Sequence, residues 1–449
     1  MRTRALFTDE TWRRQVVWVL SAIAVVLFML RVLAAAWPTQ FQIFFPDSFS
    51  FKNAALDTPF SAQFYADERP LAYPFLLFIL GRSTVVTVVV QTLLYALSFC
   101  FLARTAWKLL EHRASRIIAV MLVVALGTQS RFALWNTHIL SESVGITLGV
   151  LTTALWWRFS AALTTASLRW AGLATVAWIT VRDSNVPPWM AFGAPALLVL
   201  AWRVKSLDRN VRQAMWRWGL ITLGVAVFAT LGQAANGRNR FATMNNVGQR
   251  VLTDQKITDW FVDQGMPLGE ALKERTGKSS FDDNWQMLLS PDLEVFRKWA
   301  DDVGQRQMLV SYVRFESHWF TLLKRDLPVI LADDQSGYDA FGVGNRMPHV
   351  VWGQLGGART LTGFHLWMDA SIVALILALL RRRPQGVVLL LLLGSTFVDL
   401  YFAYVGDSVE VTRHLVGPLS RLAAISLVCA VVGLDALIGL MPRRMSASE

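Results

Sequence analysis

Residues 16–37, VVWVLSAIAVVLFMLRVLAAAW, form an apolar run that is long enough to cross a bilayer as one helix. A short motif, Phe44-Phe45-Pro46-Asp47-Ser48, follows this run closely. The carboxylate of Asp47 is therefore expected at the membrane–water interface, where burying an acid is unfavourable unless the acid is used. These two stretches predict a membrane protein with a functional acid just outside its first span.

Further apolar runs repeat this pattern along the chain. Charged residues are only 17% of the sequence, below the roughly 25% that is usual for soluble proteins. The fold class predicted is an all-α polytopic membrane protein with about ten transmembrane helices. After residues 16–37, the predicted spans are 84–104, 116–129, 138–158, 168–181, 186–203, 216–235, 363–380, 386–405 and 415–440.

Arginine and lysine residues cluster in every second loop between the predicted spans. Because cytoplasmic loops are enriched in basic residues, this alternation predicts a multi-pass protein of the cell (inner) membrane with both termini in the cytoplasm. The same placement accounts for the net charge of +11 without nucleic acid as a partner.

One long polar segment, residues 236–362, interrupts the apolar pattern. Its acids and bases nearly balance, and the stretches 292–298 and 301–315 have amphipathic helical spacing. The sequence therefore predicts three parts: an N-terminal transmembrane module (1–235) with the first outer loop (38–83), a mostly helical extracytoplasmic domain (236–362), and C-terminal transmembrane helices (363–449).

Acids, arginines and histidines gather in the loops that this topology places outside. Arginines suit a lipid phosphate in a place of low dielectric constant, because charge-assisted hydrogen bonds are strong there. A carboxylate can accept the proton of a sugar hydroxyl that attacks an anomeric carbon. An outward-facing site for an anionic lipid headgroup explains this gathering better than scattered surface charge does.

These residues divide among three expected roles, although each also has a structural interpretation as a helix cap, local ion pair or interfacial anchor. Asp47 is the expected base, and Glu142 is a second catalytic candidate. The expected ligands of a donor phosphate are Arg413, His414, Arg182, Arg131 and Arg69. The expected contacts to sugar or acceptor are His138, Tyr73, Asn185, Asp407 and Glu410.

Metal and disulfide chemistry have little support in the sequence. Cys100 and Cys429 fall in apolar runs, which predicts packed thiols. The doublets Asp282-Asp283, Asp301-Asp302 and Asp333-Asp334 lack supporting histidines and are expected on solvated faces or at helix ends. No cofactor and no metal ligand are assigned, and a divalent metal is left open.

The order and sidedness of several motifs resemble the GT-C superfamily of membrane glycosyltransferases. The first is a span followed by an outer loop with an early acid, Asp47. Residues 69–75, RPLAYPF, are similar to the family's R-x-P-x-Y-P stretch, and residues 139–143, ILSES, to its L-S/T-E-S. Residues 406–414, GDSVEVTRH, are similar to late-loop sequences of bacterial members. The resemblance covers residues 10–200 in layout and motifs, and the later half in layout only.

The resemblance implies an inverting hexosyl- or pentosyltransferase that uses a polyprenyl-phosphate sugar on the extracytoplasmic face. The acceptor would be a glycan, a lipid or a protein, and arabinofuranosyl-, mannosyl- and aminoarabinose transferases are among the relatives. Asp47 would be the base and residues 71–80 a helix along the membrane interface. Many relatives have paired acids in the first loop, whereas Ser48 follows Asp47 here, which leaves Asp67 and Glu68 as rival bases.

Two other classes of protein remain open. A lipid-linked sugar transporter needs polar residues along a path through the bilayer, and Arg31, Asp369, Asp399 and Asp435 lie inside predicted spans. A non-catalytic subunit that binds glycolipid would keep its function when Asp47 is replaced.

Overall fold

The computed structural model describes residues 46–65, 67, 69–235, 239–333 and 360–440, with helical backbone also at 15–16, 18–19, 22–23 and 26–27. Every regular element within these residues is a helix. This follows from the apolar runs, because a backbone in hydrocarbon must satisfy its polar groups internally. The predicted all-α class is confirmed.

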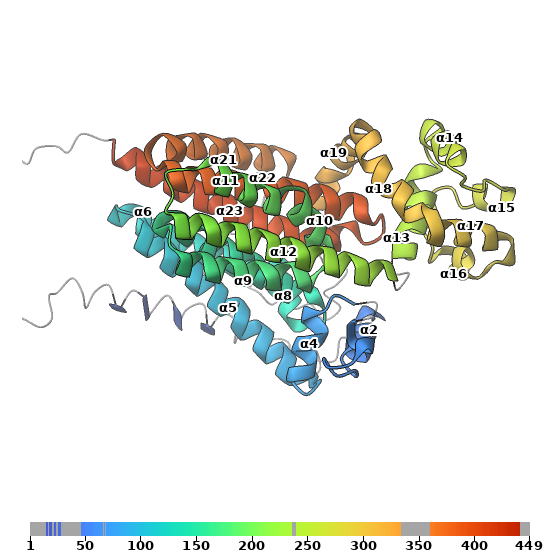
Figure 1. The fold of residues 1–449 in the computed structure, drawn as a ribbon, viewed down its shortest axis with the longest axis horizontal. Helices are drawn as coiled ribbons and strands as arrows, with labels where there is room; N and C mark the ends of the chain where they lie inside the picture. The colour runs from blue at the N-terminus through green and yellow to red at the C-terminus, as the bar shows by residue number, and fades with distance from the viewer. Residues whose placement is uncertain are drawn as a thin grey trace, which may run out of the picture.

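Among the described residues, five helices are long and apolar enough to cross a membrane, and they lie side by side in an elongated bundle (Figure 1). They are α5 (Thr84–Leu109), α12 (Arg209–Ala235), α21 (Leu361–Arg381), α22 (Arg383–Gly406) and α23 (Val411–Ile438). A sixth arises if α6 (Arg113–Gly127) forms one span with the short helices α7 (Ser130–Ala133) and η1 (Leu134–Thr137), across a bend of 54°. The chain is a helical membrane protein.

Three other predicted spans are also helical, but they are not among these apolar helices. They correspond to α8 (Ser141–Ala162), α9 (Thr165–Val181) and the broken series α10 (Val186–Pro188), η3 (Trp189–Gly193) and α11 (Ala194–Arg203). α8 is less apolar because it is an inner helix with buried polar residues, among them Glu142 and Thr153. The count of ten spans stays a prediction, and most of residues 16–37 lies outside the described residues.

The turn between α8 and α9 brings the start of one helix beside the end of the next. Leu163 ends α8 in the left-handed conformation (φ 46°), and Thr164 begins α9 with a capping box that includes Ser167. Because the two helices are antiparallel neighbours, Glu142 and Arg182 lie at the same end of the bundle.

α23 is the most buried of the candidate spans. Of its most apolar stretch 78% is buried inside the protein, against 22% for α12. A Cβ at Gly433 would lie 2.5 Å from the Cβ of Ala374, so the glycine permits the close approach of α21 and α23. Near the end of α23, Asp435 accepts hydrogen bonds from the backbone amides of Glu111 (2.9 Å) and His112 (2.8 Å).

The polar segment forms a group of short helices beyond one end of the bundle (Figure 1). They bury large apolar side chains, among them Phe261, Met287, Trp299 and Trp319, which belong to the same hydrophobic core cluster as the buried residues of the bundle. We call residues 239–333 the outer segment, and the prediction that it is mostly helical is confirmed. Its elements are α13 (Asn239–Asn246), η4 (Val247–Val251), α14 (Gln255–Asp263), α15 (Glu270–Lys273), α16 (Asp282–Leu289), η5 (Pro291–Leu293), α17 (Glu294–Trp299), η6 (Ala300–Gly304), α18 (Gln305–Arg314) and α19 (Glu316–Ala332).

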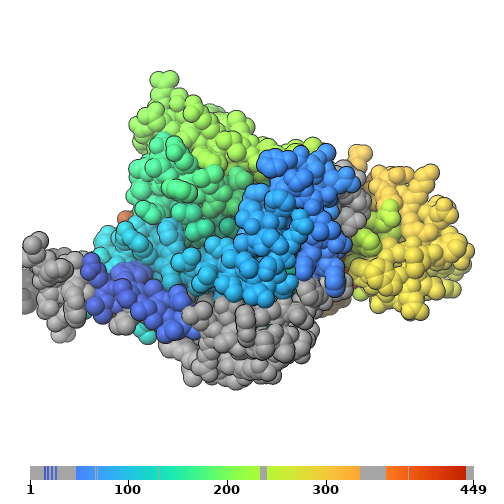
Figure 2. Space-filling model, turned by 90° about the horizontal axis from the view of Figure 1, so that it is seen from below, coloured from blue at the N-terminus to red at the C-terminus, as the bar shows by residue number. Residues whose placement is uncertain are grey.

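The first outer loop is also helical where it is described. It contains α2 (Pro46–Ala54), α3 (Ala62–Tyr65) and α4 (Ala72–Ile79), and the last of these matches the helix predicted at 71–80. Figure 2 shows this loop in blue, toward the end of the molecule that carries the outer segment in yellow.

Candidate functional site

Six charged side chains from separate segments meet at this end of the bundle, and we call them the outer charge cluster. Acids are favoured at helix N-termini by the helix dipole, which suits Asp47 and Glu142. The cluster comprises Asp47 in the first turn of α2, Arg69 before α4, Glu142 in the first turn of α8, Arg182 after α9, and Glu410 and Arg413 at the start of α23.

Arg413 is the centre of the cluster, because its guanidinium contacts all three acids. Its Nε donates to Oε1 of Glu142 at 2.7 Å, and its Nη1 donates to Oε2 of Glu410 at 2.6 Å. Its Nη2 donates to Oδ2 of Asp47 at 2.7 Å. The planar fork of arginine makes these three directed contacts, which a lysine ammonium does not match in geometry.

Asp47 has each carboxylate oxygen bonded to a different arginine. Oδ1 accepts from Nη2 of Arg69 and Oδ2 accepts from Nη2 of Arg413, both at 2.7 Å. Burial alone would raise the pKa of Asp47, but the charges of Arg413 and Arg69 outweigh it and hold the pKa well below its usual value. Asp47 is therefore ionised and only weakly basic in this arrangement.

Arg182 reaches Glu142 through a slot formed by two glycines. Its Nη2 lies 3.5 Å from Oε1 of Glu142. A Cβ at Gly145 of α8 would lie 2.9 Å from Cδ of Arg182, and a Cβ at Gly417 of α23 would lie 3.3 Å from its Nη1. The two glycines thus set the path of the arginine side chain between α8 and α23.

Three polar atoms of the cluster are buried without a hydrogen-bond partner among the residues that the structure describes. They are Oε2 of Glu142, Nη1 of Arg182 and Nε of Arg69. Because buried polar atoms are nearly always hydrogen-bonded, these atoms mark a capacity to bind a polar ligand. The two arginine donors suit an anion, and the glutamate oxygen suits a hydroxyl group.

Three other predicted ligands bond to backbone carbonyls of neighbouring elements. The guanidinium of Arg131 donates to two carbonyls near the end of α19, at 2.9 and 3.2 Å. Nδ1 of His138 lies 3.1 Å from a carbonyl of η1, and Nδ2 of Asn185 donates to a carbonyl of α9 at 2.7 Å. Arg131 therefore holds the outer segment on the bundle, and the other two side chains stabilise their local turns.

Tyr73 belongs to a hydrogen-bonded brace beside the start of α8. Its hydroxyl donates to Oε1 of Gln91 at 3.3 Å. Nε2 of Gln91 donates to the carbonyls of Asn136 and His138, both at 2.7 Å. Because those residues directly precede α8, Tyr73 helps to position the helical turn that carries Glu142.

Asp407 lies where the bundle meets the outer segment. Its Oδ1 accepts from Nδ2 of Asn245 in α13 at 2.9 Å and from the amide of Val409 at 3.0 Å. Burial raises the pKa of Asp407. The nearby Glu410 has a left-handed backbone (φ 53°) that turns the chain into α23, where its carboxylate meets Arg413.

The remaining predicted site residues flank the cluster. Asp67 accepts a hydrogen bond from the backbone amide of Arg69 at 3.0 Å and so shapes the loop that presents this arginine. His414 follows Arg413 in α23 and is half-buried. Glu68 lies outside the described residues.

A second charged pair, Asp399 and Arg421, lies deeper in the bundle. Nη1 of Arg421 lies 3.4 Å from Oδ2 of Asp399, and its Nη2 donates to Ser395 at 2.6 Å. The guanidinium also lies over the ring of Trp178, 4.4 Å from its centroid. Arg421 was not predicted, although its position two helical turns after Arg413 places both on one face of α23.

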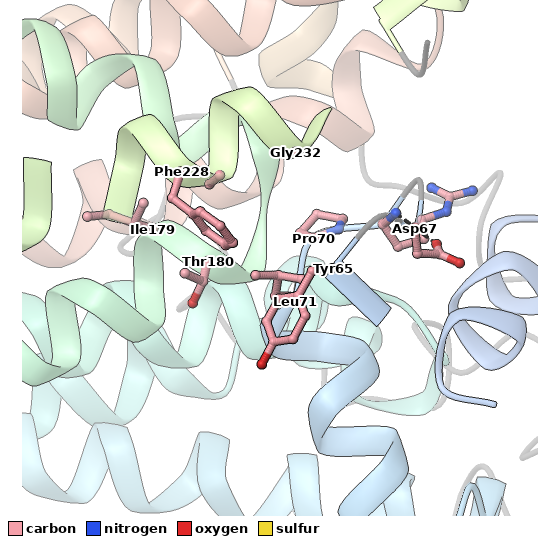
Figure 3. Close-up of a pocket in the computed structure, with 10 residues that line it drawn as sticks. Tyr65, Asp67, Pro70, Leu71, Ile179, Thr180, Phe228 and Gly232 are labelled. Carbon is pink, nitrogen blue, oxygen red and sulfur yellow. Dashed lines mark hydrogen bonds between the residues drawn. The ribbon is translucent and has the colours of Figure 1, made fainter. Parts of the chain in front are cut away.

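A groove adjoins the outer charge cluster, and we call it the lateral groove (Figure 3). Its space is about 380 Å³, including the part that is open to solvent. In Figure 3, Asp67 lies toward one end, while Ile179 and Phe228 lie toward the other. The lining residues are Tyr65, Asp67, Arg69, Pro70, Leu71, Ile179, Thr180, Phe228, Ala229 and Gly232.

Comparison with known proteins leaves the site to be interpreted from its own geometry. No family model matches the chain, and no curated protein matches it. Within the part of the chain that the structure describes, no group of three or more His, Cys, Asp or Glu side chains is arranged to hold a metal ion.

Proposed function

We propose that the protein is an inverting glycosyltransferase of the cell membrane, with about ten transmembrane helices and cytoplasmic termini. It takes a hexose or pentose from a polyprenyl-phosphate donor and passes it to a glycan, lipid or protein acceptor on the extracytoplasmic face. The proposal combines the resemblance of the sequence to the GT-C superfamily with the geometry of the outer charge cluster.

The observation that carries the proposal is the bonding of Asp47 to both Arg69 and Arg413. Inverting glycosyl transfer from a lipid phosphate needs cations that hold the phosphate and a base within reach of the acceptor hydroxyl, which attacks the anomeric carbon from the face opposite the phosphate. A phosphate held by these two arginines would bring the anomeric carbon close to Asp47.

In the proposed reaction, a hydroxyl oxygen of the acceptor attacks the anomeric carbon while the bond from that carbon to the phosphate oxygen breaks. The electron pair stays on the phosphate oxygen, where Arg413, Arg69 and Arg182 stabilise the developing charge. The hydroxyl proton passes to the carboxylate of Asp47. One displacement inverts the anomeric centre and leaves polyprenyl phosphate as the second product.

Asp47 and the donor phosphate compete for the same arginines. The outer charge cluster contains three arginines and three acids, so its formal charge is zero before an anion binds. A phosphate is accommodated when guanidinium groups turn from the carboxylates toward it. Asp47 then loses the charges that lower its pKa and becomes a stronger base, so donor binding activates it.

The proposal is tested with the purified protein in lipid nanodiscs. A panel of polyprenyl-phosphate sugars (arabinose, mannose, glucose and galactose) is supplied with a cell-wall glycan acceptor. We expect one donor to release polyprenyl phosphate and to give a product of inverted anomeric configuration by NMR. Donor binding without turnover for the whole panel would contradict the proposal and would favour a transporter or a binding subunit.

Gly145→Ala should weaken the binding of polyprenyl phosphate by about tenfold or more. The new methyl group would lie 2.9 Å from Cδ of Arg182 and displace its guanidinium, which loses a charged hydrogen bond worth ~1.5–3 kcal/mol. Gly149→Ala on the same helix is the control, because its Cβ would be 3.8 Å from the nearest atom of Arg421. Equal dissociation constants for the two variants would show that the path of Arg182 is unimportant.

A lipid-linked sugar transporter is the second candidate, and the buried pair of Asp399 and Arg421 favours it. Asp435, also inside an apolar run, is bonded to backbone amides at the turn after α5, which gives it a structural role. Movement of a labelled polyprenyl-phosphate sugar across vesicles that contain the protein, without sugar transfer, would support the transporter.

A further inference from the structure

The outer segment is attached to the bundle at the end of α22, close to the outer charge cluster, and α13 lies at this junction (Figure 1). The last carbonyl groups of a helix have no partner in their own helix and need donors from elsewhere. Nη1 of Arg250 donates to the carbonyl of Tyr404 at 2.8 Å. Nδ2 of Asn246 donates to the carbonyls of Val405 and Gly406, at 2.9 and 3.1 Å. The chain therefore leaves α22 from a point that the outer segment holds in place.

Asn245 extends this attachment to the first residue after α22. Its Nδ2 donates to Oδ1 of Asp407 at 2.9 Å. Its Oδ1 accepts hydrogen bonds from the backbone amide and the hydroxyl of Ser280, at 2.8 and 2.7 Å. Asn245 and Ser280 are both fully buried, so water does not compete for these bonds. The side chain of Asn245 thus joins the outer segment to the turn that residues 407–410 form.

This turn ends in a strained residue that belongs to the cluster. Oδ1 of Asp407 also accepts a hydrogen bond from the backbone amide of Val409 at 3.0 Å, which closes the turn. Glu410 then has a left-handed backbone (φ 53°), which is unfavourable for a residue with a Cβ and persists only where the surroundings enforce it. The turn constrains Glu410 from one side, and its ion pair with Arg413 does so from the other. Release of Asp407 by Asn245 would loosen the turn and let Glu410 relax away from Arg413.

Glu410 is the acid of the cluster that can leave most readily. Its side chain is 40% exposed, against 33% for Asp47 and 1% for Glu142, so water can solvate its carboxylate outside the cluster. Its departure would free Nη1 of Arg413, to which it is bonded at 2.6 Å. Three arginines would then face two acids, and the cluster would gain a formal positive charge. The affinity of the cluster for an anion therefore depends on how firmly Glu410 is held.

We propose that Asn245 is a positioning residue of the outer charge cluster. Through Asp407 and the 407–410 turn, it keeps Glu410 bonded to Arg413 and so limits how tightly the cluster binds a phosphate monoester. The inference rests on the proposed function, in which polyprenyl phosphate is the product that must leave. A phosphate monoester carries a charge of about −1.5 to −2 at pH 7, more than the single charge of the phosphodiester in a lipid-linked sugar. A neutral cluster favours release of this product, and Asn245 maintains that neutrality.

The first test measures binding in variants that leave the charge of the protein unchanged. Asn245→Ala removes the hydrogen bond to Asp407, and Ser280→Ala is the matched control, because the backbone amide of Ser280 still donates to Asn245. With the full chain in nanodiscs, Asn245→Ala should bind undecaprenyl phosphate about three- to fivefold more tightly, the change that corresponds to a partly exposed ion pair. Ser280→Ala should bind it like the unmodified protein. Weaker binding by Asn245→Ala would overturn the inference, since a loss of structure alone has that effect.

A double variant shows whether Asn245 acts through Glu410. Glu410→Gln removes the charge of this acid directly and should tighten the binding of undecaprenyl phosphate by a similar factor. Adding Asn245→Ala to Glu410→Gln should then change binding no further, because two changes that act through one contact are not additive. An equal tightening by Asn245→Ala in both backgrounds would contradict the inference, because Asn245 would then act without Glu410.

Hydrogen exchange follows the turn itself and needs no ligand. In Asn245→Ala, Asp407 holds the amide of Val409 less firmly, so peptides that cover residues 407–412 should exchange faster than in the unmodified protein. Peptides from α14 and α17 should be unaffected. Unchanged exchange at residues 407–412, or faster exchange throughout the outer segment, would count against the inference.

The two proposals fail separately. Tighter binding by Asn245→Ala without sugar transfer for any donor would keep the role of Asn245 and remove the enzyme. Sugar transfer by a protein in which Asn245→Ala leaves the binding of undecaprenyl phosphate unchanged would keep the enzyme and remove the role of Asn245.

Discussion

Asp47→Asn should reduce sugar transfer by about 10²–10⁴-fold, because an amide cannot take the proton of the acceptor hydroxyl. The same change should tighten the binding of polyprenyl phosphate by about tenfold. Arg69 and Arg413 no longer have to leave a carboxylate in order to bind the phosphate, and a tenfold change corresponds to about 1.4 kcal/mol. Transfer of a radiolabelled sugar and equilibrium binding of polyprenyl phosphate measure the two effects.

Slower sugar transfer together with tighter binding of polyprenyl phosphate distinguishes a base from a residue that only stabilises the fold, because loss of the fold would weaken both. Asp57→Asn, in the same outer loop but outside the cluster, is the matched control and should behave like the unmodified protein. Normal transfer by Asp47→Asn would remove the base assignment. If Asp67→Asn were then inactive, Asp67 would become the base.

Arg413→Ala should both destabilise the protein and abolish the binding of the lipid phosphate. Removing the guanidinium leaves three acids together, and Glu142 is only 1% exposed. Breaking a buried ion pair typically costs about 3–5 kcal/mol, because the remaining charge is uncompensated. Thermal unfolding in detergent and binding of polyprenyl phosphate measure the two losses.

A double variant separates these losses. Glu142→Gln in the Arg413→Ala background removes the uncompensated buried charge, so the melting temperature should recover much of its decrease. Binding should not recover, because the arginine that would hold the phosphate is still missing. An Arg413→Ala protein that binds the lipid phosphate normally would show that Arg413 is no ligand.

The sequence predicts most helices well, because long apolar runs leave the backbone few alternatives to a helix. The run 84–104 corresponds to α5 and the run 415–440 to α23. The predicted span 138–158 corresponds to α8, which begins only at Ser141. His138 instead lies in the turn that joins η1 to α8. Apolarity alone does not reveal this break, which depends on contacts with α5.

The site could be predicted only in part. The residue types follow from the loops, and Asp47, Glu142 and Arg413 do come together, whereas the side of the membrane on which they lie stays a prediction. Their pairing depends on how distant segments pack, so a nearby arginine can have another role: Arg131 bonds to α19 while Arg413 binds Glu142. Arg421 was missed, although Asp435 in the same predicted span was singled out.

The position of Arg413 in α23 sets the order in which the cluster can assemble during synthesis. A ribosome produces the first loop, α8 and α9 well before α23, so the acids of the cluster that exist by then have one arginine each: Asp47 pairs with Arg69, and Glu142 lies 3.5 Å from Arg182. These pairs of opposite charge leave no net charge at this site before α23 is synthesised. Insertion of α23 then adds Arg413, whose guanidinium bonds to Asp47 and Glu142. A chain that stops before α23 therefore lacks the centre of the outer charge cluster.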